Sequence, residues 1–138
     1  MTFTDLPDDW PERPLTEPQL VADVLDLVVS VRDRRSGALA VLMCDEDDRL
    51  VQPVVITDLE PMADEDDRCD ALAVITGAME GRGSIIVAVA RRDGLSITED
   101  DRVWARAARR AGAGAVRLLG VHLVTATGSR EVPLDLAA

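Results

Sequence analysis

The sequence predicts an α/β protein with a three-layer α/β/α fold, in which helices cover both faces of one mixed sheet of four to five strands. Short aliphatic runs alternate with helical segments along the chain, in the expected order αββαβαβ. The clearest unit is the β-branched run 84–90, which is followed by a loop and a capped helix. Hydrophobic residues make up 47% of the 138 residues and aromatic residues only 2%, so the expected core is aliphatic.

The chain begins with a segment that differs in composition from the rest. Residues 1–15 carry three prolines among acidic residues, which favours an extended N-terminal arm. Phe3 and Trp10 can anchor this arm to the domain or to a second subunit. We therefore expect an arm over residues 1–15 and a single domain over residues 16–138.

Residues 16–36 are predicted to form one helix. Thr16 is the expected N-cap, Pro18 falls in the first turn where proline costs little, and Gly37 ends the helix. Apolar residues at spacings of three and four give it one buried stripe. They are Leu20, Val21, Val24, Leu25, Val28 and Val31.

Two aliphatic runs follow, and an acidic turn separates them. Residues 38–44 and 49–57 predict an antiparallel hairpin around the turn 45–48. Pro53 lies inside the second strand and has no N–H to donate, which places it at an edge, a bulge or a break. The turn lacks the glycine that an EF-hand loop needs at its sixth position, where Leu50 stands, so a solvated turn is favoured over a calcium site.

The second half of the chain contains two helices and the remaining strands. Residues 62–79 predict a helix with an acidic first turn. The strand 84–90 leads to a helix over about 99–111, which Thr98 and Asp101 open as a capping box. Residues 116–127 contain a further strand, parallel to the strand before the crossover, and residues 131–134 can add a short edge.

Charge and composition exclude several classes of function. The net charge is −11, from 26 acidic and 15 basic residues, which disfavours nucleic acid and anionic membranes. No apolar run approaches the roughly 20 residues that span a bilayer, and no signal peptide is visible, so we expect a cytoplasmic protein. Cys44 and Cys69 lie far apart and are expected to be reduced, apolar packing residues.

Candidate site residues concentrate at the end of the strand 84–90. In α/β domains, ligands usually bind just beyond the carboxyl ends of strands. Arg91, Arg92 and Asp93 occupy this position and fit either an anion or partner contact or a charged turn. The only histidine, His122, fits a core or edge position, since one histidine cannot build a two-histidine zinc site.

The arginine row of the helix 99–111 also allows two interpretations. Its members can hold an anion, but in so acidic a chain, pairing with the protein's own carboxylates is favoured. They are Arg102, Arg106, Arg109 and Arg110.

Several short motifs resemble one known family. Their order along the chain resembles that of the RadC-like branch of the JAB/MPN fold, a relative of the cytidine deaminase fold. The matching segments are the hairpin 42–57, the strand 85–88, the helix opener Thr98-Glu99-Asp100-Asp101 and the segment Arg117-Leu118-Leu119-Gly120-Val121. The resemblance covers about residues 39–134. It implies a metalloprotease-like α/β domain with two histidines at the end of the third strand, a glutamate on the second strand of the hairpin and an aspartate that opens the next helix.

The residues at those positions depart from the family pattern. The resemblance aligns the two histidines with Val89 and Arg91 and the hairpin glutamate with Pro53, and only Asp101 matches. Valine cannot bind zinc, and arginine brings a cation where a cation should bind. We therefore expect no metal, no cofactor and a vestigial site, which comprises Pro53, Val89, Arg91, Arg92, Asp93 and Asp101.

Three hypotheses of function remain open from the sequence. The first is a non-catalytic RadC-like domain, a pseudoenzyme that acts through protein contacts and is expected to be a homodimer. The second is an enzyme that uses Arg91, Arg92, Asp93 and Asp101 on an anionic substrate. The third is a small-ligand or anion-binding regulatory module with an unrelated α/β fold.

Overall fold

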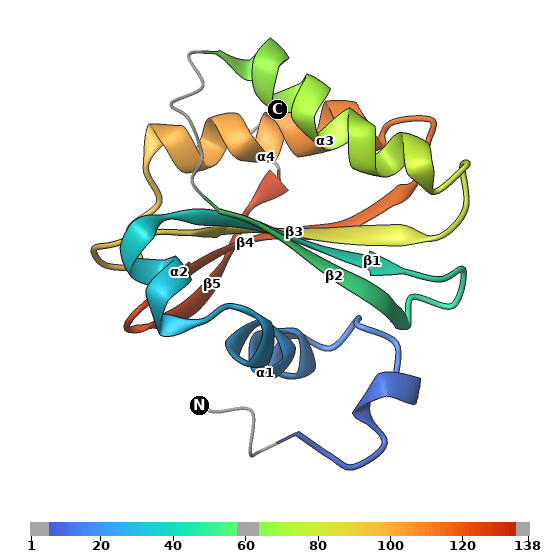
Figure 1. Cartoon of the computed structure of the whole chain (residues 1–138), viewed down its shortest axis with the longest axis horizontal. Coiled ribbons are helices and arrows are strands. Elements are labelled where there is room, and N and C mark those ends of the chain that lie inside the picture. The colour runs from blue at the N-terminus through green and yellow to red at the C-terminus, as the bar shows by residue number, and fades with distance from the viewer. Residues whose placement is uncertain (1–5, 58–63, 135–138) are drawn as a thin grey trace.

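A computed structural model describes residues 6–57 and 64–134, and it has the predicted three-layer architecture. In this part of the chain, α1 and α2 cover one face of a five-stranded mixed sheet, and α3 and α4 cover the other (Figure 1). The elements are η2 (Trp10–Glu12), α1 (Pro18–Val28), α2 (Val31–Ser36), β1 (Ala38–Cys44), β2 (Leu50–Thr57), α3 (Glu65–Ala78), β3 (Ser84–Ala90), α4 (Glu99–Gly112), β4 (Arg117–Thr125) and β5 (Gly128–Val132).

The strand order is β2-β1-β3-β4-β5, so β2 and β5 are the two edges. The predicted hairpin is confirmed, since β1 pairs antiparallel with β2 and, on its other side, with β3. The β3–β4 pair is parallel, as expected for two strands joined by the crossover helix α4, and β5 returns antiparallel to β4. Pro53 lies on the edge strand β2, one of the positions expected for a strand proline.

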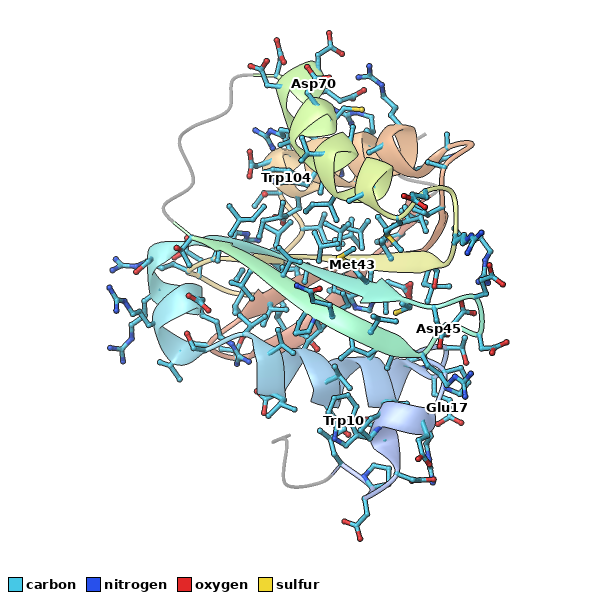
Figure 2. All side chains as sticks on the ribbon, turned by 45° about the vertical axis from the view of Figure 1, so that its right-hand side comes forward. Trp10, Glu17, Met43, Asp45, Asp70 and Trp104 are labelled. Carbon is cyan, nitrogen blue, oxygen red and sulfur yellow. The ribbon has the colours of Figure 1, made fainter. Side chains whose placement is uncertain are left out.

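Alternation along the strands divides the core into two layers (Figure 2). The α3/α4-side core contains Val41, Val87 and Trp104, whereas the α1-side core contains Leu42 and Ala88. Every residue of β3 is buried, as expected for a central strand covered on both faces. The predicted aliphatic core is therefore present on both sides of the sheet.

The single helix expected over residues 16–36 is wrong, because the chain breaks after Val28. Ser30 caps a second helix, α2: its hydroxyl accepts from the Asp33 N–H at 3.1 Å, and the Asp33 carboxylate accepts from the Ser30 N–H at 3.4 Å. A serine that can bond its own backbone neighbours favours a helix start over a helix interior. Val31 is consequently 63% exposed and not part of the buried stripe.

The predicted helix start was also misplaced. The N-cap of α1 is Glu17 rather than Thr16, and its side chain makes no capping hydrogen bond. At the other end of the chain, β5 runs from Gly128 to Val132, so the final edge strand begins earlier than the predicted segment 131–134. Part of the predicted helix 62–79 falls outside the described residues, and the described helix α3 begins after the Asp64 N-cap.

The described part of the N-terminal segment lies against the domain. Trp10 packs against the α1-side core, and Pro14 forms an isolated bridge with Arg49. Leu15 is only 1% exposed, and its N–H donates to the Asp48 carbonyl at 2.8 Å. None of the described helices has the length and apolar character needed to cross a membrane.

Candidate functional site

The predicted site region is built where β3 ends and α4 begins. Thr98 and Asp101 form the expected capping box: the Asp101 N–H donates to Thr98 Oγ1 at 3.2 Å, and the Thr98 N–H donates to Asp101 Oδ2 at 2.9 Å. This reciprocal bonding fixes the first turn of α4. It also holds the Asp101 carboxylate toward the sheet, where its side chain is fully buried.

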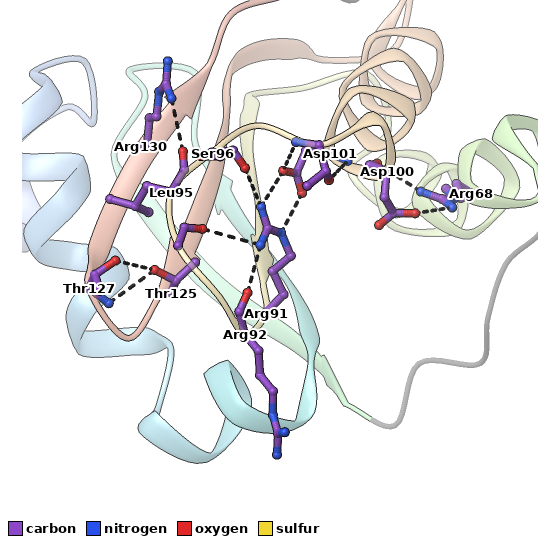
Figure 3. A network of polar contacts seen from close by, with 12 residues as sticks. Arg68, Arg91, Arg92, Leu95, Ser96, Asp100, Asp101, Thr125, Thr127 and Arg130 are labelled. Atoms are coloured by element: carbon purple, nitrogen blue, oxygen red, sulfur yellow. Dashed lines mark hydrogen bonds and ion pairs between the residues drawn. The ribbon is translucent and has the colours of Figure 1, made fainter.

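Arg91 meets this carboxylate in a bidentate ion pair (Figure 3). Its Nε donates to Asp101 Oδ1 at 3.1 Å, and Nη2 donates to Oδ2 at 2.9 Å. The other donors reach backbone carbonyls: Nη2 donates to Ser96 at 2.8 Å, and Nη1 donates to Arg92 at 2.8 Å and to Gly94 at 3.5 Å. Every N–H of the guanidinium is therefore engaged within the protein.

The electrostatics of the pair follow from burial and from these bonds. Burial by itself raises the pKa of Asp101, but the hydrogen bonds from Arg91 and the Thr98 N–H outweigh it, so the pKa lies below the ordinary value. The hydrogen bond to Asp101 raises the pKa of Arg91 above that of a free arginine. Both groups are therefore charged at neutral pH, and neither is suited to exchange protons with a substrate.

Nearby charges extend the network on both sides of the pair. Asp100 forms an ion pair with Arg68, with 2.6 Å between Oδ1 and Nη2, and the Arg68 guanidinium lies 5.1 Å from the centroid of the Trp104 ring. On the other side, Arg130 Nη1 of β5 donates to the Leu95 carbonyl at 3.1 Å. Arg68 thus ties α3 to the first turn of α4, and Arg130 ties β5 to the loop between β3 and α4.

The remaining predicted site residues do not converge on the pair. Arg92 extends away from it (Figure 3), and its Nε donates to the Arg35 carbonyl at 2.8 Å. Asp93 is an exposed turn residue with a φ of 76°. Val89 is 5% exposed within the α3/α4-side core.

Pro53 lies on the other face of the sheet from Val89. Its pairing partner on β1 is Leu42, which belongs to the α1-side core. In the sequence-based hypothesis Pro53 occupies the same vestigial site as Arg91 and Asp101. The structure separates it from them both across the sheet and along the strands.

Three of the four arginines in the α4 row, Arg102, Arg106 and Arg110, pair with the protein's own acids, as favoured from the sequence, whereas Arg109 donates to the Leu134 carbonyl. Arg106 Nε lies 2.7 Å from Glu65 Oε1, and Arg110 Nη1 contacts Glu65 at 2.9 Å and Asp66 at 2.7 Å. Hydrogen bonds from these two arginines lower the pKa of Glu65. These ion pairs join α3 to α4 at the surface.

Among the described residues, no three histidine, cysteine, aspartate or glutamate side chains gather as a metal site. Both cysteines are free thiols. Cys44 is buried, and burial raises the pKa of its thiol to about 11, which leaves it unreactive at neutral pH. Among the pockets of the described residues, two are considered for function, and the sequence pattern alone identified neither of them.

The larger feature is a shallow hollow of about 500 Å³ at the amino ends of β3 and β4. Arg82 and Arg117 line it together with glycine-rich turns. Arg117 is already engaged, since Nη2 lies 2.9 Å from Asp48 Oδ1 and donates to the Glu46 carbonyl at 2.8 Å.

The smaller feature is a pocket of about 170 Å³ on the α1 side of the sheet, lined by His122 and Glu131. The sequence placed His122 in the core or at an edge, and the side chain is 9% exposed. Its pairing with Glu131 depends on the β4–β5 register. The sequence feature that could have indicated this pairing was the turn after residue 125, because it returns the chain as a strand antiparallel to β4.

Comparison of the chain with protein-family models, curated proteins and solved structures gave no match. The geometry defines the class of the protein as a three-layer α/β/α domain with a mixed five-stranded sheet among its described residues. The RadC-like resemblance stays a prediction that rests on the motifs in the sequence.

Proposed function

We propose that this protein is a non-catalytic domain that acts through protein contacts. The observation that carries the proposal is the engagement of Arg91: every N–H of its guanidinium is bonded to Asp101 or to carbonyls of its own loop. A substrate anion at the end of β3 would have to displace these bonds. The pair therefore supports a structural clamp at the position where an α/β enzyme would place its reactive groups.

The proposal includes a RadC-like origin with a degenerate metal site. Val89 is buried in the core and carries no donor atom, and Arg91 is a fixed cation. These properties argue against zinc chemistry at the two positions that the resemblance aligns with histidines. The free thiols are compatible with the reducing cytoplasm, the location that we propose.

The partner that we propose is a second copy of this chain, paired along the edge strand β2. Natural edge strands are commonly protected by shortness, charge or proline. The edge β5 is short, with five residues, two of them charged, whereas β2 has eight residues with no charge among them and Pro53 as its single proline. Val51 on β2 is 68% exposed. Pro53 withholds one N–H, and the remaining residues of β2 can pair antiparallel about a twofold axis.

Light scattering on the untagged protein tests the self-association. We expect a mass of twice the 14.9 kDa chain mass. Val51→Lys should shift the equilibrium to the monomer, because it places a charge on the proposed interface. Val74→Lys is the matched control, since Val74 is 75% exposed on α3, away from β2, and this variant should remain dimeric. A monomer at every concentration, or equal effects of both variants, contradicts pairing through β2.

Zinc titration tests the non-catalytic character separately. We expect no change in the melting temperature with stoichiometric zinc and no cleavage of isopeptide substrates. Zinc-dependent cleavage that is lost in the Asp101→Asn variant would refute the proposal, whatever the oligomeric state.

The second hypothesis, an enzyme that uses Arg91 and Asp101, is not favoured by this geometry. The third hypothesis, a small-ligand module, is favoured by one specific observation, the pocket at His122.

A further inference from the structure

The pocket on the α1 side of the sheet has walls from four elements and from the segment before α1. Its apolar lining residues are Leu15, Pro18, Val21, Ile86 and Leu119. Its polar lining residues are Thr16, His122 and Glu131. The volume of about 170 Å³ greatly exceeds the roughly 10–15 Å³ that one water molecule requires. The pocket is thus large enough for a small organic molecule.

Gly120 keeps this space open beside the two ionisable groups. A Cβ at this position would lie 3.3 Å from His122 Nε2 and 3.4 Å from Glu131 Oε2. Both atoms therefore border the same small region above the glycine. His122 and Glu131 are also register partners on β4 and β5, which fixes their side chains on the same face of the sheet.

The His122 side chain is largely buried, but its ring nitrogens are not among the fully buried side-chain atoms that lack a hydrogen-bond partner in the described residues. It is 9% exposed and forms no hydrogen bond or ion pair with any residue in the described parts of the chain. The ring nitrogens are therefore available to a ligand in the pocket that His122 lines. Burial lowers the pKa of His122 to about 4, and the imidazole is therefore neutral at pH 7. A neutral ring offers one acceptor nitrogen and one donor nitrogen.

The lining defines the chemical class of the ligand. Glu131 supplies a carboxylate, His122 supplies a neutral nitrogen, and no lysine or arginine among the described residues lines the pocket. Two acceptors without a cation favour a ligand that donates hydrogen bonds and carries a positive charge. The aliphatic walls favour an apolar body of a few carbon atoms, and the net charge of −11 attracts cations to the protein.

We infer that this pocket binds a small organic ammonium ion, whose N–H groups donate to Glu131 and to Nε2 of His122 while its alkyl part contacts Leu15, Val21 and Ile86. This inference goes beyond the proposed function and rests on different residues. If the protein does not pair through β2, the ligand pocket is unaffected. If the pocket binds no ammonium ion, the structural role of Arg91 is unaffected.

The test uses the chain's single histidine as its own reporter. The full-length, untagged protein is labelled with ¹⁵N and titrated with isobutylammonium chloride at constant ionic strength, and the imidazole nitrogen shifts are recorded by NMR. We expect a saturable shift of the His122 resonances in the millimolar range. Isobutyrate at the same concentrations should give none, because Glu131 repels an anion.

Variants locate the response in the pocket. Glu131→Gln removes the charge and should weaken binding about tenfold or more, the ratio expected when a charged hydrogen bond becomes neutral. Glu80→Gln is the matched control, because Glu80 lies in the turn after α3 and does not line the pocket. Gly120→Ala provides a second test, since its methyl group occupies the space between the two groups and should abolish the shift.

Three outcomes would overturn the inference. The first is the absence of a saturable His122 shift with isobutylammonium. The second is an equal response to isobutyrate, and the third is an affinity that Glu131→Gln and Glu80→Gln leave unchanged alike.

Discussion

Replacing Arg91 by methionine should be among the most destabilising changes in this protein. The substitution removes two charge-assisted hydrogen bonds from Asp101, whose side chain is fully buried. Such bonds contribute about 1.5–3 kcal/mol each, and leaving one charge of a buried pair without its partner costs roughly 3–5 kcal/mol. We therefore expect Arg91→Met to lower the free energy of unfolding by about 3–5 kcal/mol.

A double-mutant cycle with Asp101→Asn separates this pair from its surroundings. The asparagine keeps an oxygen that can accept from the Thr98 N–H but has no charge to leave unpaired. The double variant should therefore be more stable than the sum of the single losses implies, with a coupling energy of about 1.5–3 kcal/mol. Urea unfolding followed by circular dichroism measures all four proteins at pH 7.

Arg92→Met is the matched control for this cycle. The neighbouring arginine makes one exposed hydrogen bond, to the Arg35 carbonyl, and its replacement should cost less than about 1 kcal/mol. A coupling energy below about 0.5 kcal/mol, or equal losses for Arg91→Met and Arg92→Met, would refute the reading of Arg91 as a structural clamp.

Two further predictions concern His122 and Gly83. His122 has a pKa of about 4 in the folded state against 6.5 for a free histidine, so the unfolded chain binds more protons between these values and stability falls as the pH falls through that window. The free energy of unfolding should fall by about 2 kcal/mol from pH 7 to pH 5, and this fall should be absent in His122→Asn. Urea unfolding at the two pH values measures it, and equal losses in both proteins would contradict the prediction. Gly83→Ala should cost at least about 3 kcal/mol, because φ is +88° and the new Cβ would lie 2.1 Å from the Cys44 carbonyl oxygen. A Cβ at Gly77 on α3 would meet no atom within 4 Å, so Gly77→Ala should instead stabilise the protein by about 1 kcal/mol. Thermal melting compares the two glycine variants, and melting temperatures that shift in the same direction would contradict this reasoning.

Periodicity in the sequence determined the class of fold. The run 84–90 has the composition of a doubly covered strand, and all of its residues are buried. The capping box of Thr98 and Asp101 was readable because it depends on residues three positions apart, and both of its hydrogen bonds are present. The predicted helix over 16–36 failed because apolar spacing continued through Val31, while the local bonding of Ser30 and Asp33 ended one helix and began another.

The roles of the site residues depended on contacts between distant segments. The sequence predicted that Arg91 and Asp101 lie near the same strand end. Their ion pair, and the hydrogen bonds of every guanidinium N–H, depend on the conformation of the loop between β3 and α4. Pro53 aligned with a site position by motif order, and strand register placed it on the other face of the sheet.

Local interactions in the sequence therefore determined the helices and strands of this protein, because helix caps, turns and strand composition act over only a few residues. The tertiary structure alone decided which groups meet. His122 and Glu131 face the same pocket because an antiparallel register pairs β4 with β5, and Gly120 leaves room beside them. The short turn between β4 and β5 sets this register locally, whereas the residues of α1, β3 and the segment before α1 that surround the pair are brought there by the packing of the whole domain, which no local pattern specifies.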